Sequence, residues 1–282
     1  MKLCRYGKPG FEKPGMIDGE GKLRDLSKIV DNLGPNEISP RGLKMLTRLK
    51  ADSLPLVNGN PRLGVPYVGI GKLVAIGLNY SDHAKEAGLP IPSEPIVFMK
   101  ATTCINGPYD DVIQPRNSTK LDWEIELGVV IGTTARYVDE ASALNHVAGY
   151  CIVNDVSERA FQMATTQWDK GKGFDTSGPI GPWLVTTDEI QDPQTLDMKL
   201  EVNGKVMQSG NTRTMVFDVA KIISHVSQYM TLLPGDAIAT GTPPGVGLGM
   251  KPPVFLKPGD VMTLTIEGLG QQRQKVVPYS AQ

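Results

Sequence analysis

Short apolar runs separated by glycine and proline turns dominate this chain from residue 72 onward. Its 282 residues include 31 glycines and 22 prolines, and no apolar run approaches the ~20 residues of a membrane span. Runs this short favour strands over helices, so we predict an α+β, predominantly β fold with a mixed sheet. The predicted strands are Leu73–Leu78, Ile96–Lys100, Trp123–Ile131, Val147–Asn154, Trp183–Thr186, Met198–Val202, Ala237–Thr240 and Val261–Ile266.

The first 70 residues differ in pattern from the rest and predict a small N-terminal domain, followed by a larger domain over residues 71–282. Residues 7–10 and 18–21 fit hairpin loops, and residues 40–49 fit a helix. Two longer helices are predicted over residues 139–146 and 216–230, the first with an acidic cap.

Charge and cysteine content narrow the function. The 29 basic and 30 acidic residues are interspersed, which argues against nucleic-acid or membrane partners and favours small ligands. The N-terminus lacks the apolar region of a signal peptide, so we expect a cytoplasmic protein. Cys4, Cys104 and Cys151 are scattered and predict reduced thiols, with no disulfide framework or zinc site.

Three acids lie within or directly after apolar runs. Glu124 and Glu126 are two residues apart, so on a strand both face one way while Trp123, Ile125 and Leu127 face the other; Asp155 ends a second run. Buried together, such acids would repel each other unless a cation neutralised them, and an all-oxygen set favours Mg²⁺ or Mn²⁺. The alternative is an ordinary pair of acids on a solvated strand face.

The segment after Asp155 reads as a short helix. It would place Asp155, Arg159 and Gln162 on one stripe, where an acid, a guanidinium and an amide face the same place. The alternative for Arg159 is a salt bridge to Asp155 on a solvated helix.

His83 and Glu86 are three residues apart in a predicted short helix that follows an apolar strand. A carboxylate on the same helical face would hold one imidazole nitrogen and leave the other as a base. The alternative is an exposed polar pair. His146 and His225, by contrast, are expected to be structural or solvated.

Two glycine-rich segments supply further candidates. In the first, Lys172 lies between glycines that let the backbone approach a ligand closely, and its ammonium can offset oxyanion charge; an exposed loop lysine is the alternative. In the second, residues 240–247, backbone amides and Thr242 are expected to face a carboxylate. Neither the phosphate-loop nor the dinucleotide-binding pattern is complete, so ATP and NAD are not supported.

Together these segments resemble the fumarylacetoacetate hydrolase family over residues 70–270. The motifs that carry the resemblance are Gly77-Leu-Asn-Tyr-Ser-Asp-His83 with Glu86, Phe98-Met-Lys100, Trp123-Glu-Ile-Glu-Leu-Gly-Val-Val130, Asn154-Asp-Val-Ser-Glu-Arg159, Lys172-Gly-Phe-Asp-Thr176 and Thr240-Gly-Thr-Pro-Pro-Gly-Val-Gly247. The resemblance implies a mixed β-sandwich roll with a small N-terminal domain, and a homodimer.

The resemblance also implies roles for individual residues. The implied metal ligands are Glu124, Glu126 and Asp155, the implied water-activating pair is His83 with Glu86, the implied oxyanion partners are Lys172 and Gln162, and the implied substrate contacts are Arg159 and Thr242. Fumarylacetoacetate hydrolase itself uses a fourth carboxylate where this chain has Ile76. This departure argues against fumarylacetoacetate as the substrate.

The predicted activity is hydrolysis of a carbon–carbon bond in a small 2,4-diketo acid, with Mg²⁺ or Mn²⁺ as cofactor, to give pyruvate and a second acid. The resemblance favours a 2,4-diketo-3-deoxy sugar acid, and hence carbohydrate catabolism. The alternatives are a ureidoglycolate lyase, an oxaloacetate decarboxylase, a 2-hydroxyhepta-2,4-diene-1,7-dioate isomerase and a non-enzymatic sugar-acid binding module. The His83–Glu86 pair distinguishes the last of these, because binding alone needs no base.

Overall fold

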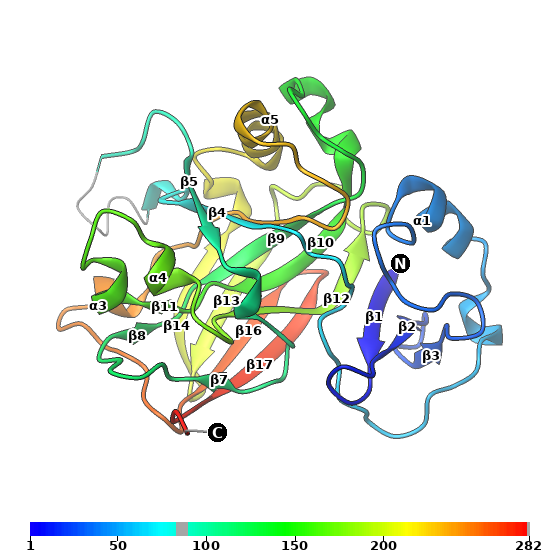
Figure 1. Cartoon of the computed structure of the whole chain (residues 1–282), viewed down its shortest axis with the longest axis horizontal. Coiled ribbons are helices and arrows are strands. Elements are labelled where there is room, and N and C mark those ends of the chain that lie inside the picture. The colour runs from blue at the N-terminus through cyan, green and yellow to red at the C-terminus, as the bar shows by residue number, and fades with distance from the viewer. Residues whose placement is uncertain (83–89, 281–282) are drawn as a thin grey trace.

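A ten-stranded mixed sheet runs through the whole molecule (Figure 1). The computed structural model describes residues 1–82 and 90–280. Nine strands follow the order β3 (Leu23–Asp25), β2 (Lys13–Ile17), β1 (Lys2–Tyr6), β12 (Gly178–Thr186), β10 (Val147–Asn154), β9 (Ile125–Ile131), β15 (Ala237–Ala239), β4 (Leu73–Gly77) and β5 (Ile96–Lys100), and β6 (Ile105–Asn106) pairs with β12.

A second, five-stranded sheet packs against one face of the first. Its order is β14 (Lys205–Asn211), β13 (Asp197–Val202), β16 (Val261–Ile266), β17 (Gly270–Val277) and β7 (Val112–Ile113), and a small third sheet pairs β11 (Ser157–Glu158) with β8 (Leu121–Asp122). Alternate residues of β9, among them Ile125 and Leu127, meet Leu200 and Leu264 of the second sheet in the main core. The predicted fold class, α+β and predominantly β, is confirmed.

Helices are short and lie at the edges of the sheets. In the part of the chain that the structure describes, the α-helices with given bounds are α1 (Pro40–Leu46), α3 (Arg159–Gln162), α4 (Asp169–Lys172) and α5 (Val219–Tyr229), and the 3₁₀ helices are η1 (Ala51–Ser53), η2 (Thr102–Cys104), η3 (Glu140–His146), η4 (Thr212–Thr214) and η5 (Gly247–Gly249). The helix predicted from Asp139 is therefore a 3₁₀ helix, and the Asp139 side chain makes no cap hydrogen bond. Across the described residues, no helix has the length and apolarity to cross a bilayer.

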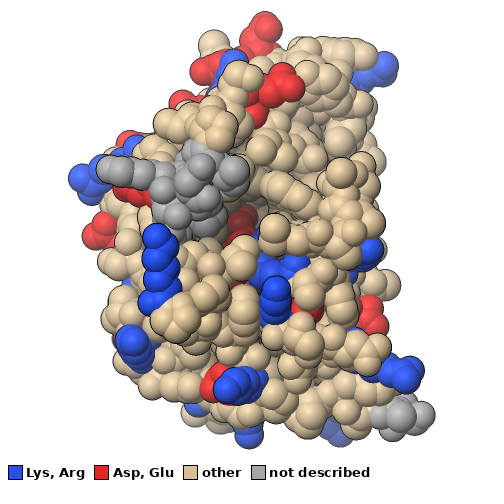
Figure 2. All heavy atoms as spheres, turned by 90° about the vertical axis from the view of Figure 1, so that its left-hand side faces the viewer, with Lys and Arg blue, Asp and Glu red and all other residues tan. Residues whose placement is uncertain are grey.

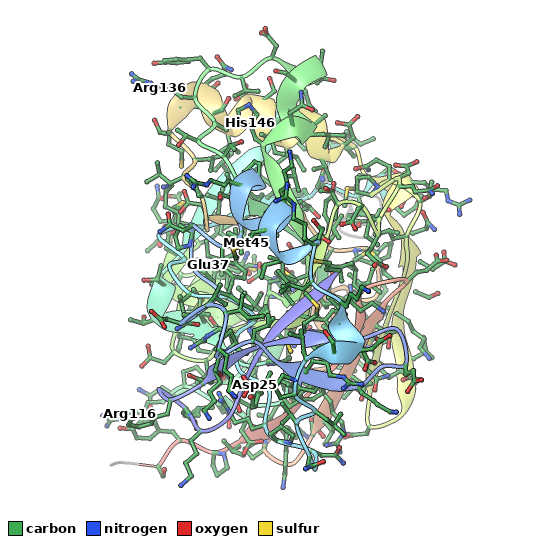
Figure 3. The ribbon with its side chains drawn as sticks, turned by 90° about the vertical axis from the view of Figure 1, so that its right-hand side faces the viewer. Asp25, Glu37, Met45, Arg116, Arg136 and His146 are labelled. Atoms are coloured by element: carbon green, nitrogen blue, oxygen red, sulfur yellow. The ribbon has the colours of Figure 1, made fainter. Side chains whose placement is uncertain are left out.

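The N-terminal strands continue the large sheet. Strand β1 pairs antiparallel with β12 through Lys2–Val185 and Leu3–Leu184, and both predicted hairpins, β1–β2 and β2–β3, are present. These strands and α1 lie on the opposite side of the molecule from α3 and α4 (Figures 1 and 3). A second core, with Leu3, Leu46 and Val153 among its members, joins residues 1–70 to that side of the sheet.

Strands that differ from the sequence prediction include β12, which is longer than predicted, and β14 and β17, which were not predicted. Strand β12 begins at Gly178, five residues before the predicted start, although Pro179 and Pro182 lie within it. Strand β17 was not predicted because the residues it buries include the polar Gln272 and Gln274, which carry no apolar signal; Gln274 donates from Nε2 to the Pro108 carbonyl and to Gln272 Oε1.

Candidate active site

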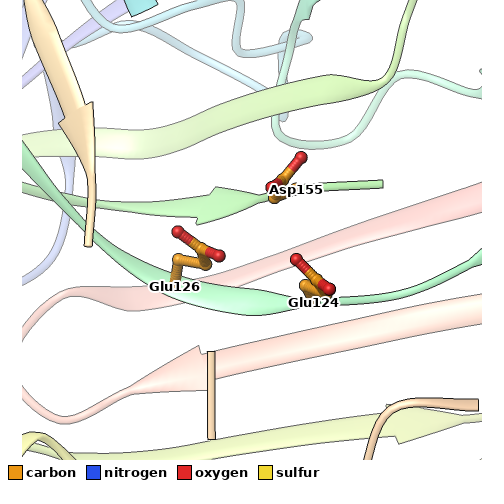
Figure 4. Close-up of side chains that lie close together, drawn as sticks. All are labelled: Glu124, Glu126 and Asp155. Carbon is orange, nitrogen blue, oxygen red and sulfur yellow. The ribbon is translucent and has the colours of Figure 1, made fainter. Parts of the chain in front are cut away.

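Three acids from two neighbouring strands form the centre of the site (Figure 4). Glu126 lies on β9 opposite Val153 of β10, Glu124 directly precedes β9, and Asp155 directly follows β10 and donates its backbone N–H to the Glu124 carbonyl. Side-chain alternation along both strands turns the three carboxylates to the same face. One oxygen from each lies within 4.8 Å of the others.

The cluster is buried, which excludes the reading of a solvated strand face. Glu124, Glu126 and Asp155 are 5%, 2% and 0% exposed. Burial raises the pKa of Glu126 well above the ordinary carboxyl value, and the charges on Asp155 and Glu124 raise it further, against the lowering effects of Lys172 and of the Gly241 N–H bond. A cation bound beside Glu126 would act in the opposite direction and lower this pKa.

Lys172 and Arg159 partly neutralise these acids. Lys172, at the end of α4, donates from Nζ to Glu124 Oε2 and Asp155 Oδ2, both at 2.7 Å. Burial lowers the pKa of Lys172, but the charges on Asp155 and Glu124 outweigh this effect and the pKa is raised. The ammonium therefore stays charged, and the reading of Lys172 as an exposed loop lysine is wrong.

The glycine before Lys172 does allow a close approach, but to protein. A Cβ at Gly171 would lie 2.3 Å from the backbone nitrogen of Gln162, so this glycine lets α3 and α4 pack together. This packing places the Lys172 ammonium within hydrogen-bond distance of Glu124 and Asp155.

The helix predicted after Asp155 begins later, at Arg159. Ser157 and Glu158 pair with β8, and the Glu158 side chain caps α3 by accepting from the Phe161 N–H. Arg159 donates from Nη1 to Gln162 Oε1 at 3.0 Å. Arg159 and Gln162 converge as predicted. Asp155 does not lie on the same helical stripe, because the pairing of Ser157 and Glu158 with β8 overrides the local helical pattern.

Arg159 pairs with acids other than Asp155, so the alternative of a salt bridge to Asp155 on a solvated helix is wrong. Its Nη2 donates to Glu124 Oε1 at 2.6 Å and its Nε to Asp122 Oδ2 at 2.9 Å. Burial lowers the pKa of Arg159, and the charges on Glu124 and Asp122 more than offset this, so the guanidinium stays charged.

Two buried residues of the site were not predicted from the sequence. Asp122 precedes Glu124 by two residues and faces the same way. Because alternate residues of an extended chain share a face, the spacing in the sequence already indicates this. Lys100, at the end of β5, donates from Nζ to Asp155 Oδ1 at 2.6 Å. Lys100 ends one of the motifs that carry the resemblance, but no local pattern predicts its contacts, because its partners come from distant parts of the chain.

The loop over residues 240–247 turns its amides toward carboxylates of the protein. Gly241 N–H donates to Glu126 Oε2 at 2.8 Å, and Gly247 N–H to Asp122 Oδ1 at 2.7 Å. The Thr242 hydroxyl donates to the Ile125 carbonyl and accepts from Gln208 Nε2, both at 2.8 Å. Thr242 thus lies beside the acids, with its proton committed to the backbone.

The histidines fall into two groups. His83 and Glu86 lie outside the described residues, so their predicted role stays a prediction; the chain enters a helical turn at Ser81 and Asp82 just before them. His146 ends η3 near α5 (Figure 3), where Nδ1 lies 3.2 Å from Thr133 Oγ1. His225 lies edge-on to the ring of Tyr229.

The residues present fit a divalent cation. Within the described chain, four acids (Asp122, Glu124, Glu126, Asp155) meet three basic side chains (Lys100, Arg159, Lys172), and no lysine or arginine pairs with Glu126. Fully ionised, the cluster carries one excess negative charge, and an all-oxygen set suits Mg²⁺ or Mn²⁺. On the face that carries α3 and α4, acidic atoms are visible in a recess with basic side chains nearby (Figure 2).

An aromatic pair lines the Lys172 side chain. The ammonium lies 5.2 Å from the centroid of the Phe98 ring, and the Trp168 ring meets Phe98 edge-on at 5.4 Å. The buried ammonium thus contacts an aromatic ring as well as its carboxylate partners.

Comparison with known proteins identifies the family. Residues 72–277 match the family profile described as fumarylacetoacetate (FAA) hydrolase C-terminal. A 2,4-didehydro-3-deoxy-L-rhamnonate hydrolase from Sphingomonas sp. (strain SKA58) is 60% identical over 278 residues, which cover 98% of this chain and 96% of that protein.

Solved structures agree along the whole chain. Fumarylacetoacetate hydrolase from psychrophilic Exiguobacterium antarcticum is 38% identical with a TM-score of 0.89, covering 99% of this chain and 100% of that one. A 2-hydroxyhepta-2,4-diene-1,7-dioate isomerase from Mycobacterium marinum is 33% identical with a TM-score of 0.76, covering 100% of both chains. The chain therefore belongs to the fumarylacetoacetate hydrolase family.

Proposed function

We propose that this protein is a divalent-cation-dependent hydrolase that cleaves a carbon–carbon bond in a small 2,4-diketo acid. The buried cluster of Glu124, Glu126 and Asp155, with Lys172 and Arg159 in contact with it, is the observation that carries the proposal. The 60% identity to a 2,4-didehydro-3-deoxy-L-rhamnonate hydrolase supports a diketo sugar acid as substrate.

Glu124, Glu126 and Asp155 would hold the cation, Mg²⁺ or Mn²⁺. When bound, the cation would act as a Lewis acid toward the 2-oxo carboxylate end of the substrate. With two added positive charges, the fully ionised cluster changes from one excess negative to one excess positive charge. That sign favours an anionic substrate.

The chain's own residues would carry the remaining steps. His83, oriented by Glu86, takes a proton from water, and the resulting hydroxide adds to the 4-keto carbon. Lys172 and Gln162 stabilise the oxyanion, and Arg159 and Thr242 position the substrate. The C3–C4 bond then breaks, its electron pair stays on C3, and a proton at C3 completes pyruvate. Carbons 4 to 6 of a 3-deoxy-rhamnonate skeleton would leave as lactate.

The test is pyruvate release from 2,4-dioxo acids, followed as NADH oxidation by lactate dehydrogenase, with oxaloacetate and ureidoglycolate assayed alongside. We expect pyruvate from the dioxo acids, loss of activity in EDTA and recovery with Mg²⁺ or Mn²⁺. Full activity in metal-free buffer would refute the cation requirement. Glyoxylate from ureidoglycolate, with no pyruvate from any dioxo acid, would refute the hydrolase.

An isomerase is the second candidate, because a 33% identical structure of the same fold is named as one. It would convert 2-hydroxyhepta-2,4-diene-1,7-dioate without releasing pyruvate, which the same assay distinguishes. We further propose that the protein is a cytoplasmic homodimer. Analytical ultracentrifugation and cell fractionation test these two points.

A further inference from the structure

Lys100 is a lysine with no exposed side-chain surface, and its partners come from three distant segments. It ends β5, where it pairs with Leu73 of β4, and its side chain is 0% exposed. A lone buried ammonium would cost several kcal/mol, so its position depends on the groups that it meets.

The Lys100 ammonium holds one oxygen of Asp155. Nζ donates to Asp155 Oδ1 at 2.6 Å, while the other oxygen, Oδ2, accepts from Lys172. With both oxygens held from different sides, the plane of the carboxylate is fixed. Asp155 therefore cannot turn without breaking a charged hydrogen bond.

The same ammonium holds the backbone of Lys172. Nζ donates to the Lys172 carbonyl, which also accepts from Ser177 Oγ at 2.8 Å. Lys172 is the last residue of α4, so this carbonyl has no partner within the helix, and a cation suits the helix C-terminus. Lys100 thus joins an acid of the cluster to the main chain of the lysine that contacts it.

We propose that Lys100 is a positioning residue, which fixes Asp155 and Lys172 relative to each other for cation binding and turnover. The inference rests on the proposed function in taking Asp155 as a cation ligand. The alternative role for Lys100 is to neutralise the charge of the acids without positioning any residue. The two roles predict opposite changes in dication affinity when Lys100 is replaced. Loss of a residue that only neutralises charge makes the site more negative and strengthens dication binding, whereas loss of a positioning residue weakens dication binding.

The experiment is Mn²⁺ binding to Lys100→Met, measured by electron paramagnetic resonance of free Mn²⁺, with turnover of 2,4-dioxopentanoate at saturating Mn²⁺. Loss of an outer partner of a metal ligand typically costs about 10- to 100-fold, so we expect Mn²⁺ affinity and kcat each to fall by about that much, with a smaller change in KM. Lys72→Met is the matched control, because Lys72 pairs with buried Asp236 away from the cluster and should bind Mn²⁺ as the wild type does.

Unchanged or tighter Mn²⁺ binding by Lys100→Met would overturn the inference. Wild-type protein that neither binds Mn²⁺ nor cleaves a diketo acid would instead refute the proposed function, and this inference with it. Ser177→Ala is the second variant if Lys100→Met does not fold. It removes the hydroxyl that donates to the Lys172 carbonyl and accepts from the Lys100 ammonium at 3.4 Å, but it leaves the bond from Lys100 to Asp155 in place, so kcat should fall while Mn²⁺ affinity is kept. Wild-type kcat in Ser177→Ala would overturn the positioning of Lys172.

Discussion

Replacing Lys172 with methionine should destabilise the cation-free protein strongly. The side chain keeps its approximate volume, but Glu124 and Asp155 each lose a buried charged hydrogen bond of 2.7 Å. Removing one partner of a buried ion pair costs about 3–5 kcal/mol. An unfolding entropy of about 2.1 cal/mol/K per residue gives about 0.6 kcal/mol/K for 282 residues, so the melting temperature should fall by about 5–8 °C.

The assay is thermal unfolding followed by circular dichroism, in EDTA and again at saturating Mn²⁺. A bound dication would itself neutralise Glu124 and Asp155, so the difference from wild type should shrink when Mn²⁺ is added. Lys72→Met is the control, because its ammonium is partly exposed and its loss should cost less. A wild-type melting temperature in EDTA, or a deficit that Mn²⁺ leaves unchanged, would refute the reasoning.

Four further outcomes are expected. Lys172→Met should also lower kcat on a 2,4-dioxo acid by about two orders of magnitude, about 3 kcal/mol in the barrier, as initial rates will show. Because the pKa of Glu126 is raised in the folded state, its contribution to the stability of the cation-free protein should fall as pH rises from about 4.5 to that raised pKa, and should be constant below 4.5, where Glu126 is protonated in both states. Urea titrations at several pH values across that window should show this fall in the free energy of unfolding in the wild type but not in Glu126→Gln. Gly241→Ala should lower the urea midpoint, because at φ 98° its Cβ would meet Asn79 Cβ at 2.8 Å, whereas Gly10→Ala, also at positive φ but in open space, should lower it less. His83→Ala should lower kcat by roughly 10²–10⁴ while calorimetry shows Mn²⁺ binding intact, and a near-normal kcat would exclude His83 as the base.

The acid cluster was predictable because alternation is a property of the extended backbone itself. Glu124 and Glu126 had to share a face once β9 formed, and Trp123 and Ile125 had to face the main core. The same rule applies to Asp122, which lies two residues before Glu124. The burial of the acids was not predictable, because it depends on what covers that face.

The remaining contacts depend on the tertiary fold. Lys100 reaches Asp155 only because β5 pairs with β4 and α4 packs against β5. No sequence pattern near Lys100 indicates either contact. The helix predicted from Asp155 fails for the same reason, since Ser157 pairs with Asp122 of β8. Spacing thus predicted which side chains would meet, but not which hydrogen bonds they would make.

The contact chain from Lys172 through Phe98 to Trp168 gives the protein an internal optical reporter. Indole emission responds to nearby charge, and an ammonium that shifts when a cation enters changes the electric field at that ring. The chain has three tryptophans, and the other two are Trp123, buried in the main core, and Trp183, on β12. A variant in which Phe replaces those two would let the fluorescence of Trp168 alone follow occupancy of the site in real time, without label or substrate.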